Sequence, residues 1–180
     1  MGVWSIFTFL VFYLEEVIGA ERPAQLLTLL LGAGALLAVP ASLYGIHLAR
    51  QHGNVAIVRA SSWVISAAAI GYVLIALRPS VGWVAPVVMV FAAAYSAYQA
   101  VDWALAIEVL PDLKNAGKDM GVWHISMVLP QIVGPAATGW LISGLKQAHS
   151  AQLAYTTAFA LAAAGFVLAA WLVGRVRLPD

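Results

Sequence analysis

Long apolar runs, separated by short turns that carry charged or helix-breaking residues, are the feature that most limits how this chain can fold. An unpaired backbone amide or carbonyl is costly in hydrocarbon, so an α-helix is the economical way for such a run to cross a bilayer. Hydropathy predicts an all-α membrane protein with one membrane domain over residues 1–180 and six helices, at about residues 2–14, 24–48, 56–77, 84–110, 120–145 and 151–173. The first segment is shorter than the about 20 residues that a full crossing requires.

The composition also favours a lipid bilayer as the surrounding solvent. The chain is 63% hydrophobic and 9% charged, whereas soluble domains are about 45–50% apolar and about 25% charged. A net charge of +1 offers no basic face for nucleic acid, and the lack of cysteine excludes disulfides and thiolate metal ligands. No phosphate-binding glycine loop, nucleophile elbow or zinc-binding histidine pair occurs, so we expect no enzyme, metal site or cofactor.

The apolar start of the chain differs from a secretory signal peptide. No lysine or arginine precedes the run Met1–Leu14, and two acidic residues, Glu15 and Glu16, follow it. A secretory signal begins with basic residues and ends at a cleavage site of small residues. We therefore interpret this run as part of a membrane helix.

The distribution of lysine and arginine predicts the orientation in the membrane. If the chain starts in the cytoplasm, six of the nine basic residues fall on the cytoplasmic side, namely Arg50, Arg59, Lys114, Lys118, Arg175 and Arg177. The other three, Arg22, Arg78 and Lys146, then fall outside. Because cytoplasmic loops carry an excess of basic residues, we expect both termini in the cytoplasm.

An acidic residue lies well inside the fourth segment. A carboxylate at the middle of a bilayer costs about 2.5–3.5 kcal/mol or more, so Asp102 is expected to have a partner or a function. Helical spacing places Tyr95, Tyr98, Gln99 and Asp102 on one face. One interpretation is a cavity wall in which Asp102 binds a proton, a cation or a substrate hydroxyl. The other is a buried carboxyl group bonded to a neighbouring helix.

The fifth segment carries a second polar face. His124 and Gln131 lie two helical turns apart and therefore share a side of the helix. Histidine could relay protons near neutral pH, or it could simply bond to a backbone carbonyl or a tryptophan edge. Pro130 and Pro135 should bend this helix, and interrupted helices often line transporter sites.

The remaining charged residues lie at the helix ends. We expect Glu108 to point away from Asp102 and to pair with Lys114 or Lys118 at the cytoplasmic end. The acidic residues near the other end form either a solvated rim or a vestibule that attracts cations. The third and sixth segments carry few polar residues and could face lipid on most sides, whereas the small residues at 32–40 favour close helix packing.

One stretch of the chain carries a family resemblance. The run "YQAVDWALAIEVLPDLKNAGKDMGVWHISMVLPQIVGP", at residues 98–135, resembles the tenth and eleventh helices, and their connecting loop, of major facilitator superfamily transporters. It is most similar to bacterial relatives of sucrose-type glycoside–cation symporters. The matching positions are Asp102, Leu110-Pro111, Gly117-Lys118, Gly121 and Pro130-Gln131.

A second stretch, "YGIHLARQHGN", resembles the loop that joins the second and third helices of each half in this superfamily. Gly45 and Arg50 match. The stretch departs from the usual pattern because Ala49 stands where an acidic residue is common and Gly53 falls one position late. The resemblance would assign Arg50, Glu108, Lys114 and Lys118 to the cytoplasmic loops and their gating, and the departures weaken the case for a salt-bridge gate.

The resemblance implies the C-terminal six-helix half of a twelve-helix transporter that moves a small, possibly sugar-like solute by alternating access, coupled to an ion such as the proton. The first, second, fourth and fifth helices would line the cavity, and the third and sixth would lie outside. The partner would be an N-terminal six-helix half, or a second copy of a half-size chain, in a bacterial cytoplasmic membrane. The alternative from another class is a membrane scaffold or assembly subunit that transports nothing.

Overall fold

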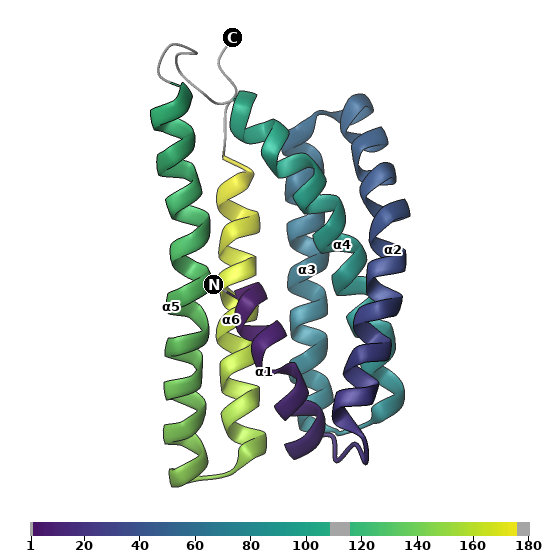
Figure 1. Ribbon diagram of the computed structural model, residues 1–180, viewed down its shortest axis with the longest axis vertical. Helices are drawn as coiled ribbons and strands as arrows, with labels where there is room; N and C mark the ends of the chain where they lie inside the picture. Colours follow the sequence, from purple (N-terminus) through teal and green to yellow (C-terminus); the bar gives the residue numbers. More distant parts are fainter. Residues whose placement is uncertain (1, 109–115, 176–180) are drawn as a thin grey trace.

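The computed structural model describes residues 2–108 and 116–175, and all six of its secondary-structure elements are helices. They are α1 (Gly2–Glu16), α2 (Pro23–His52), α3 (Asn54–Leu77), α4 (Val81–Glu108), α5 (Ala116–Ala148) and α6 (Ala151–Val173), as Figure 1 shows. The predicted all-α class is confirmed. Most helices extend a few residues beyond the apolar runs.

Five helices, α2 to α6, are long and apolar enough to cross a membrane, which indicates an integral membrane protein. In contrast, the 15 residues of α1 rise only about 22 Å, against a hydrocarbon core of about 30 Å. All six predicted segments are therefore helical, but the first does not reach spanning length.

Local sequence signals explain where several helices begin and end. Pro23 occupies the first turn of α2, where its missing N–H costs nothing. Gly53 separates α2 from α3 with a φ of 84°, a conformation that glycine adopts readily. The Ser150 side chain caps α6 by accepting a hydrogen bond from the backbone N–H of Leu153 at 3.2 Å.

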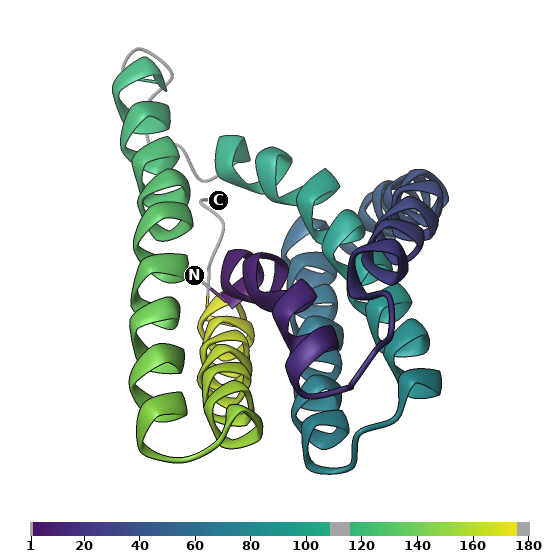
Figure 2. The ribbon, with the colours of Figure 1, turned by 60° about the horizontal axis from the view of Figure 1, so that its bottom comes forward.

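The five long helices run along one axis, and α1 occupies the lower half of the face seen in Figure 1. Helix α3 packs against both α4 and α6, α2 packs against α4, and α5 packs against α6 and α1. Figure 2 shows α1 in the space that α5, α6, α3 and α4 surround. We call the end where α2 ends and α3 begins the α2–α3 end; α4 and α6 also end there, and α5 begins there.

The burial of α3 differs from the expectation that the third segment faces lipid on most sides. In the most apolar 18-residue stretch of α3, 50% of the residues are buried, whereas the corresponding share in α2 and in α5 is 11%. Its buried face consists largely of alanine and serine, and the hydroxyls of Ser62 and Ser66 bond to carbonyls one turn back. The prediction was wrong because small apolar residues suit close helix packing as well as they suit lipid contact.

A cluster of buried aromatic rings fixes α1 against α3, α4 and α6. Five of these rings are at most 2% exposed, those of Tyr13, Tyr72, Phe91, Tyr155 and Phe159. The ring centroids of Tyr13 and Phe159 are 5.0 Å apart. The Tyr13 hydroxyl donates a 3.0 Å hydrogen bond to the Tyr72 carbonyl, which satisfies a polar group that would otherwise be costly to bury.

Glycines bring α2 and α4 into close contact. A Cβ atom on Gly45 would lie 2.9 Å from the Cβ of Ala97, and one on Gly34 would lie 3.3 Å from the Cβ of Ala92. Gly34 belongs to the small-residue stretch at 32–40, so its expected packing role is observed. Gly32, in the same stretch, faces open space.

Candidate functional site

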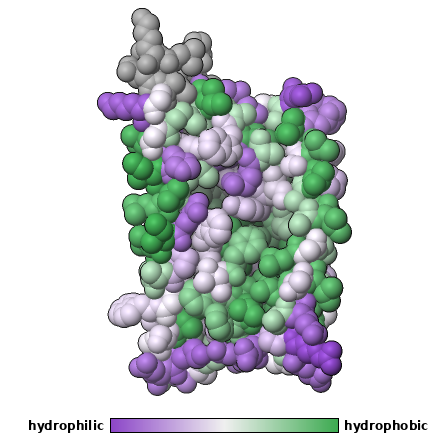
Figure 3. Space-filling model, viewed as in Figure 1, coloured by the Kyte–Doolittle hydropathy of each residue, from purple (hydrophilic) through white to green (hydrophobic). Residues whose placement is uncertain are grey.

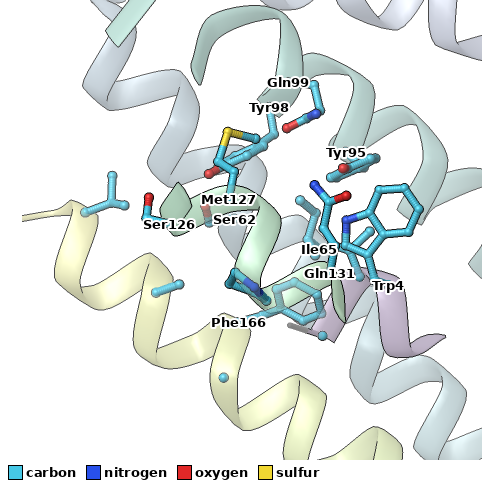
Figure 4. Close-up of a pocket in the computed structure, with 16 residues that line it drawn as sticks. Trp4, Ser62, Ile65, Tyr95, Tyr98, Gln99, Ser126, Met127, Gln131 and Phe166 are labelled. Carbon is cyan, nitrogen blue, oxygen red and sulfur yellow. The ribbon is translucent and has the colours of Figure 1, made fainter. Parts of the chain in front are cut away.

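A pocket of about 380 Å³ lies at the middle of the bundle. Figure 4 shows the side chains that surround it, contributed by α1, α3, α4, α5 and α6. Its polar and aromatic lining residues are Trp4, Ser62, Tyr95, Tyr98, Gln99, Ser126, Gln131 and Phe166. The first residues of α1 form part of the wall.

One wall of the pocket is the face of α4 that the sequence predicts. Tyr95, Tyr98 and Gln99 are half-buried and lie within little more than one helical turn. The rings of Tyr95 and Tyr98 stack with their centroids 6.4 Å apart and their planes inclined by 10°. Gln131 faces this wall from α5 (Figure 4). The structure therefore brings together four of the six residues predicted for the solute pathway.

Asp102 lies beside the pocket and does not line it. It is half-buried, one turn beyond Tyr98, and its carboxyl group lies within hydrogen-bonding reach of the Tyr98 side chain. The contact lies within α4, not between helices. Asp102 is thus connected to the pocket wall through Tyr98, because Tyr98 belongs to the wall.

His124 lies away from the pocket. Its side chain is exposed, near the beginning of α5, and it is absent from the pocket lining. Two helical turns separate it from Gln131. The shared face predicted from the spacing brings Gln131 and Met127 to the pocket but leaves His124 nearer the α2–α3 end.

Several lining residues were absent from the sequence-based prediction. Met127 lies between His124 and Gln131 at helical spacing, so the periodicity of α5 could have identified it. Trp4, Ser62 and Phe166 come from α1, α3 and α6. No sequence pattern connects these three residues to α4, because only the packing of the helices brings them together.

A polar contact at the α2–α3 end involves Glu108, one of the residues predicted for the cytoplasmic loops. The Asn54 amide donates a 2.7 Å hydrogen bond to Glu108, and both side chains line a separate cavity of about 430 Å³ together with Arg50. Lys114, one of the expected partners of Glu108, lies outside the described residues. Lys118 is described and forms no salt bridge with Glu108; among the described residues, Asn54 at the start of α3 bonds to Glu108 instead.

The opposite end carries the acidic residues expected to form a rim. Glu15 and Glu21 are exposed, whereas Glu16 pairs with Lys146 of α5 at 2.5 Å. The side chain of Tyr155 is also hydrogen-bonded to Glu16. The rim is therefore partly neutralised, and it ties α1 to α5 and α6.

Figure 3 shows how polarity is distributed over the face that carries α1. Hydrophilic and neutral residues form a strip in the upper half of the middle of this face, apolar residues occupy its lower half, and strongly apolar residues flank it on both sides. Hydrophilic residues also gather at both ends of the bundle. This face is therefore more polar in its upper half than the flanking helices are.

Within the described residues, no group of three or more histidine, cysteine, aspartate or glutamate side chains could hold a metal ion. No protein-family model, curated protein or solved structure matches the chain. The function therefore has to be argued from the pocket and its chemistry.

Proposed function

We propose that this chain is one six-helix half, the C-terminal one, of a secondary-active transporter of the major facilitator type. It moves a small solute by alternating access, coupled to an ion such as the proton, in a bacterial cytoplasmic membrane with both termini inside. Its partner is an N-terminal half or a second copy of the chain. The observation that carries this proposal is a hydrogen-bonding pocket at the middle of a bundle of membrane-spanning length.

The pocket chemistry suits a neutral solute rich in hydroxyl groups. The amides of Gln99 and Gln131 both donate and accept hydrogen bonds, and the indole of Trp4 offers an apolar face with a single donor. The described residues that line the pocket include no charged side chain. A sugar fits this combination better than an organic acid does, since an acid would call for a nearby cation. A volume of about 380 Å³ falls in the range of ordinary ligand pockets.

A hydrogen bond between Tyr98 and Asp102 would offer a route for ion coupling. Tyr98 touches the pocket, and Asp102 is a carboxyl group placed inside a spanning helix. Protonation of Asp102 would change the acceptor available to Tyr98 and hence the hydroxyl presented to the solute. The resemblance at Asp102 and Pro130-Gln131 supports the same assignment.

The second candidate function is that of a scaffold subunit. The exposed apolar side chains on α2 and α5 favour this function. Trp140 on α5 is 82% exposed and Leu36 on α2 is 80% exposed, so both helices present apolar faces that partner helices could cover. In a scaffold, partner helices would pack over the polar strip and exclude water from the pocket.

Water accessibility separates the two functions. The chain has no cysteine, so Gln99→Cys and Gln131→Cys each introduce the only thiol. A membrane-impermeant, charged thiol reagent should label both in a transporter, and added solute should protect them. Leu161→Cys, at a 60% exposed apolar position on α6, is the matched control and should stay unlabelled. Silent thiols at both glutamine positions would favour the scaffold.

The role of Asp102 is tested in the complete transporter. Asp102→Asn removes the titratable group and keeps the shape of the side chain. We expect solute accumulation driven by a pH gradient to disappear, while exchange without a gradient persists. If uptake and its pH dependence are both unchanged, Asp102 has no part in the mechanism.

A further inference from the structure

A second pocket lies at the α2–α3 end, between α3 and α6 and apart from the central pocket. Its volume is about 580 Å³. It contains two arginines, Arg59 and Arg175, and two tryptophans, Trp63 and Trp171. None of the described residues that line it is acidic, and neither arginine forms a salt bridge with another described residue. Among the described residues, these two cations at the end of two membrane helices have no carboxylate partner, so both are available to an external anion.

The packing around Gly174 directs the two arginines to the same place. A Cβ atom on Gly174 would lie 3.2 Å from Cδ and 3.7 Å from Nη1 of Arg59. The Arg59 side chain therefore lies across the backbone of the turn that carries Arg175. The Arg175 guanidinium sits 3.6 Å from the centre of the Trp171 ring, a cation–π contact that holds it at the pocket.

The surroundings of the pocket match the boundary between lipid headgroups and acyl chains. Trp63 and Trp171 are 47% and 48% exposed, and half-exposed tryptophans at helix ends are typical of that boundary. Below Arg59, the exposed side chains of Trp63, Ala67 and Ile70 follow one another along α3. From Arg59 to Ile70 the helix rises about 16 Å. The hydrocarbon layer of one leaflet is about 15 Å thick, so the two lengths match.

We propose that Arg59 and Arg175 bind the phosphate of an anionic phospholipid, with Trp63 and Trp171 on either side of the headgroup and one acyl chain along the Trp63–Ile70 stripe of α3. Guanidinium groups bind phosphate oxygens through paired, charge-assisted hydrogen bonds. A zwitterionic lipid brings its own cation to a pocket that already holds two, so a net negative headgroup is preferred. This site does not depend on the proposed transport activity.

The first test measures lipid retention by the full chain in detergent, using native mass spectrometry with dioleoyl-phosphatidylglycerol and dioleoyl-phosphatidylcholine. The wild type should prefer the anionic lipid. A charge near the membrane surface changes binding by about fivefold. We therefore expect Arg59→Gln/Arg175→Gln to weaken phosphatidylglycerol binding by roughly 25-fold and to leave phosphatidylcholine binding nearly unchanged. Arg22→Gln/Arg78→Gln, with the same change in charge on residues at the opposite end, is the control and should behave like the wild type.

A second variant separates a built site from diffuse surface charge. Gly174→Leu keeps both arginines but places a side chain where Arg59 now lies. We expect it to weaken phosphatidylglycerol binding severalfold, with the elution volume and helical circular dichroism of the wild type. If Gly174→Leu binds like the wild type, or if the two double-arginine variants lose affinity equally, the pocket is not the site and the proposal fails.

Inorganic phosphate tests whether a lipid, and not a free anion, is the ligand. Because a lipid also occupies the apolar stripe, a large molar excess of inorganic phosphate should displace little phosphatidylglycerol. Ile70→Asp, which interrupts the stripe with a charge, should weaken lipid binding. Displacement of the lipid by phosphate at equal concentration would show that the acyl chain adds nothing, and would overturn the assignment to a lipid.

Discussion

The indole rings of Trp103 on α4 and Trp123 on α5 meet edge to face, with their centroids 4.3 Å apart and their planes inclined by 68°. Helix α5 packs mainly on α6 and α1. The two tryptophans therefore join α4 and α5 at the α2–α3 end, above the pocket, where α1 does not reach (Figure 1).

Replacing either tryptophan with leucine should destabilise the bundle. An aromatic pair contributes about 0.5–1.5 kcal/mol beyond its buried area, so Trp103→Leu and Trp123→Leu should each lower the free energy of unfolding by about that amount. The double variant should cost little more than either single one. Unfolding in mixed detergent measures all three. Trp140→Leu, at an 82% exposed position on α5, is the control; an equal loss there would show that the pair adds nothing.

Alanine at Gly45 should force α2 away from α4. The new Cβ would lie 2.9 Å from the Cβ and 3.0 Å from the Cα of Ala97, and overpacking of this kind costs about 1–3 kcal/mol. Gly32→Ala, on the same helix, meets nothing within 4 Å and should leave stability unchanged or raise it by up to about 1 kcal/mol. Thermal unfolding of the two variants compares them directly. Equal melting temperatures would contradict the close approach.

The bond between Tyr98 and Asp102 should appear as a coupling energy. Tyr98→Phe, Asp102→Ala and the double variant form a cycle, and a hydrogen bond to a charged or buried carboxyl group contributes about 1.5–3 kcal/mol. We expect the losses of unfolding free energy in the two single variants to sum to more than the loss in the double variant. Tyr44→Phe, at a 64% exposed tyrosine on α2, should change nothing. Additive losses would mean that the two side chains do not interact.

The contact between Asn54 and Glu108 should respond to charge. Asn54→Asp replaces the donor with a second carboxylate beside Glu108, and we expect a loss of up to about 1 kcal/mol because the site is exposed. The loss should shrink as salt is added. Lys118→Gln should leave stability unchanged, since Lys118 does not pair with Glu108. A larger effect from Lys118 than from Asn54 would restore the pairing first expected.

The sequence predicts those features that depend on local pattern. Apolar runs locate the helices, and helical spacing places Tyr95, Tyr98 and Gln99 on one wall before any packing is known. Features that depend on which helices meet are not predictable in this way. Trp4 reaches the pocket because α1 packs between the two sides of the bundle.

Two further features depend on tertiary packing that the sequence pattern does not show. The bland composition of α3 suggested lipid, yet in a membrane protein alanine and serine are compatible with both lipid and a helix neighbour. Glu108 was expected to pair with Lys114 or Lys118; the described Lys118 forms no salt bridge with it, and Asn54 at the start of α3 donates a hydrogen bond to it. Short-range reasoning cannot choose between partners whose positions are set by tertiary packing.

In the proposed transporter, the two prolines of α5 would affect how a membrane voltage is distributed across the protein. Pro130 and Pro135 cannot donate to the carbonyls of Ser126 and Gln131, four residues earlier, and both of these residues line the central pocket. Free carbonyl oxygens are costly in hydrocarbon, so water or solute has to solvate them there. If water fills the central pocket, it would shorten the insulating layer, and most of the potential difference would fall over the remaining sealed part of the bundle. A charge that moves within the sealed part, such as a proton on Asp102, would then cross a larger share of the membrane potential than its depth in the bilayer alone implies.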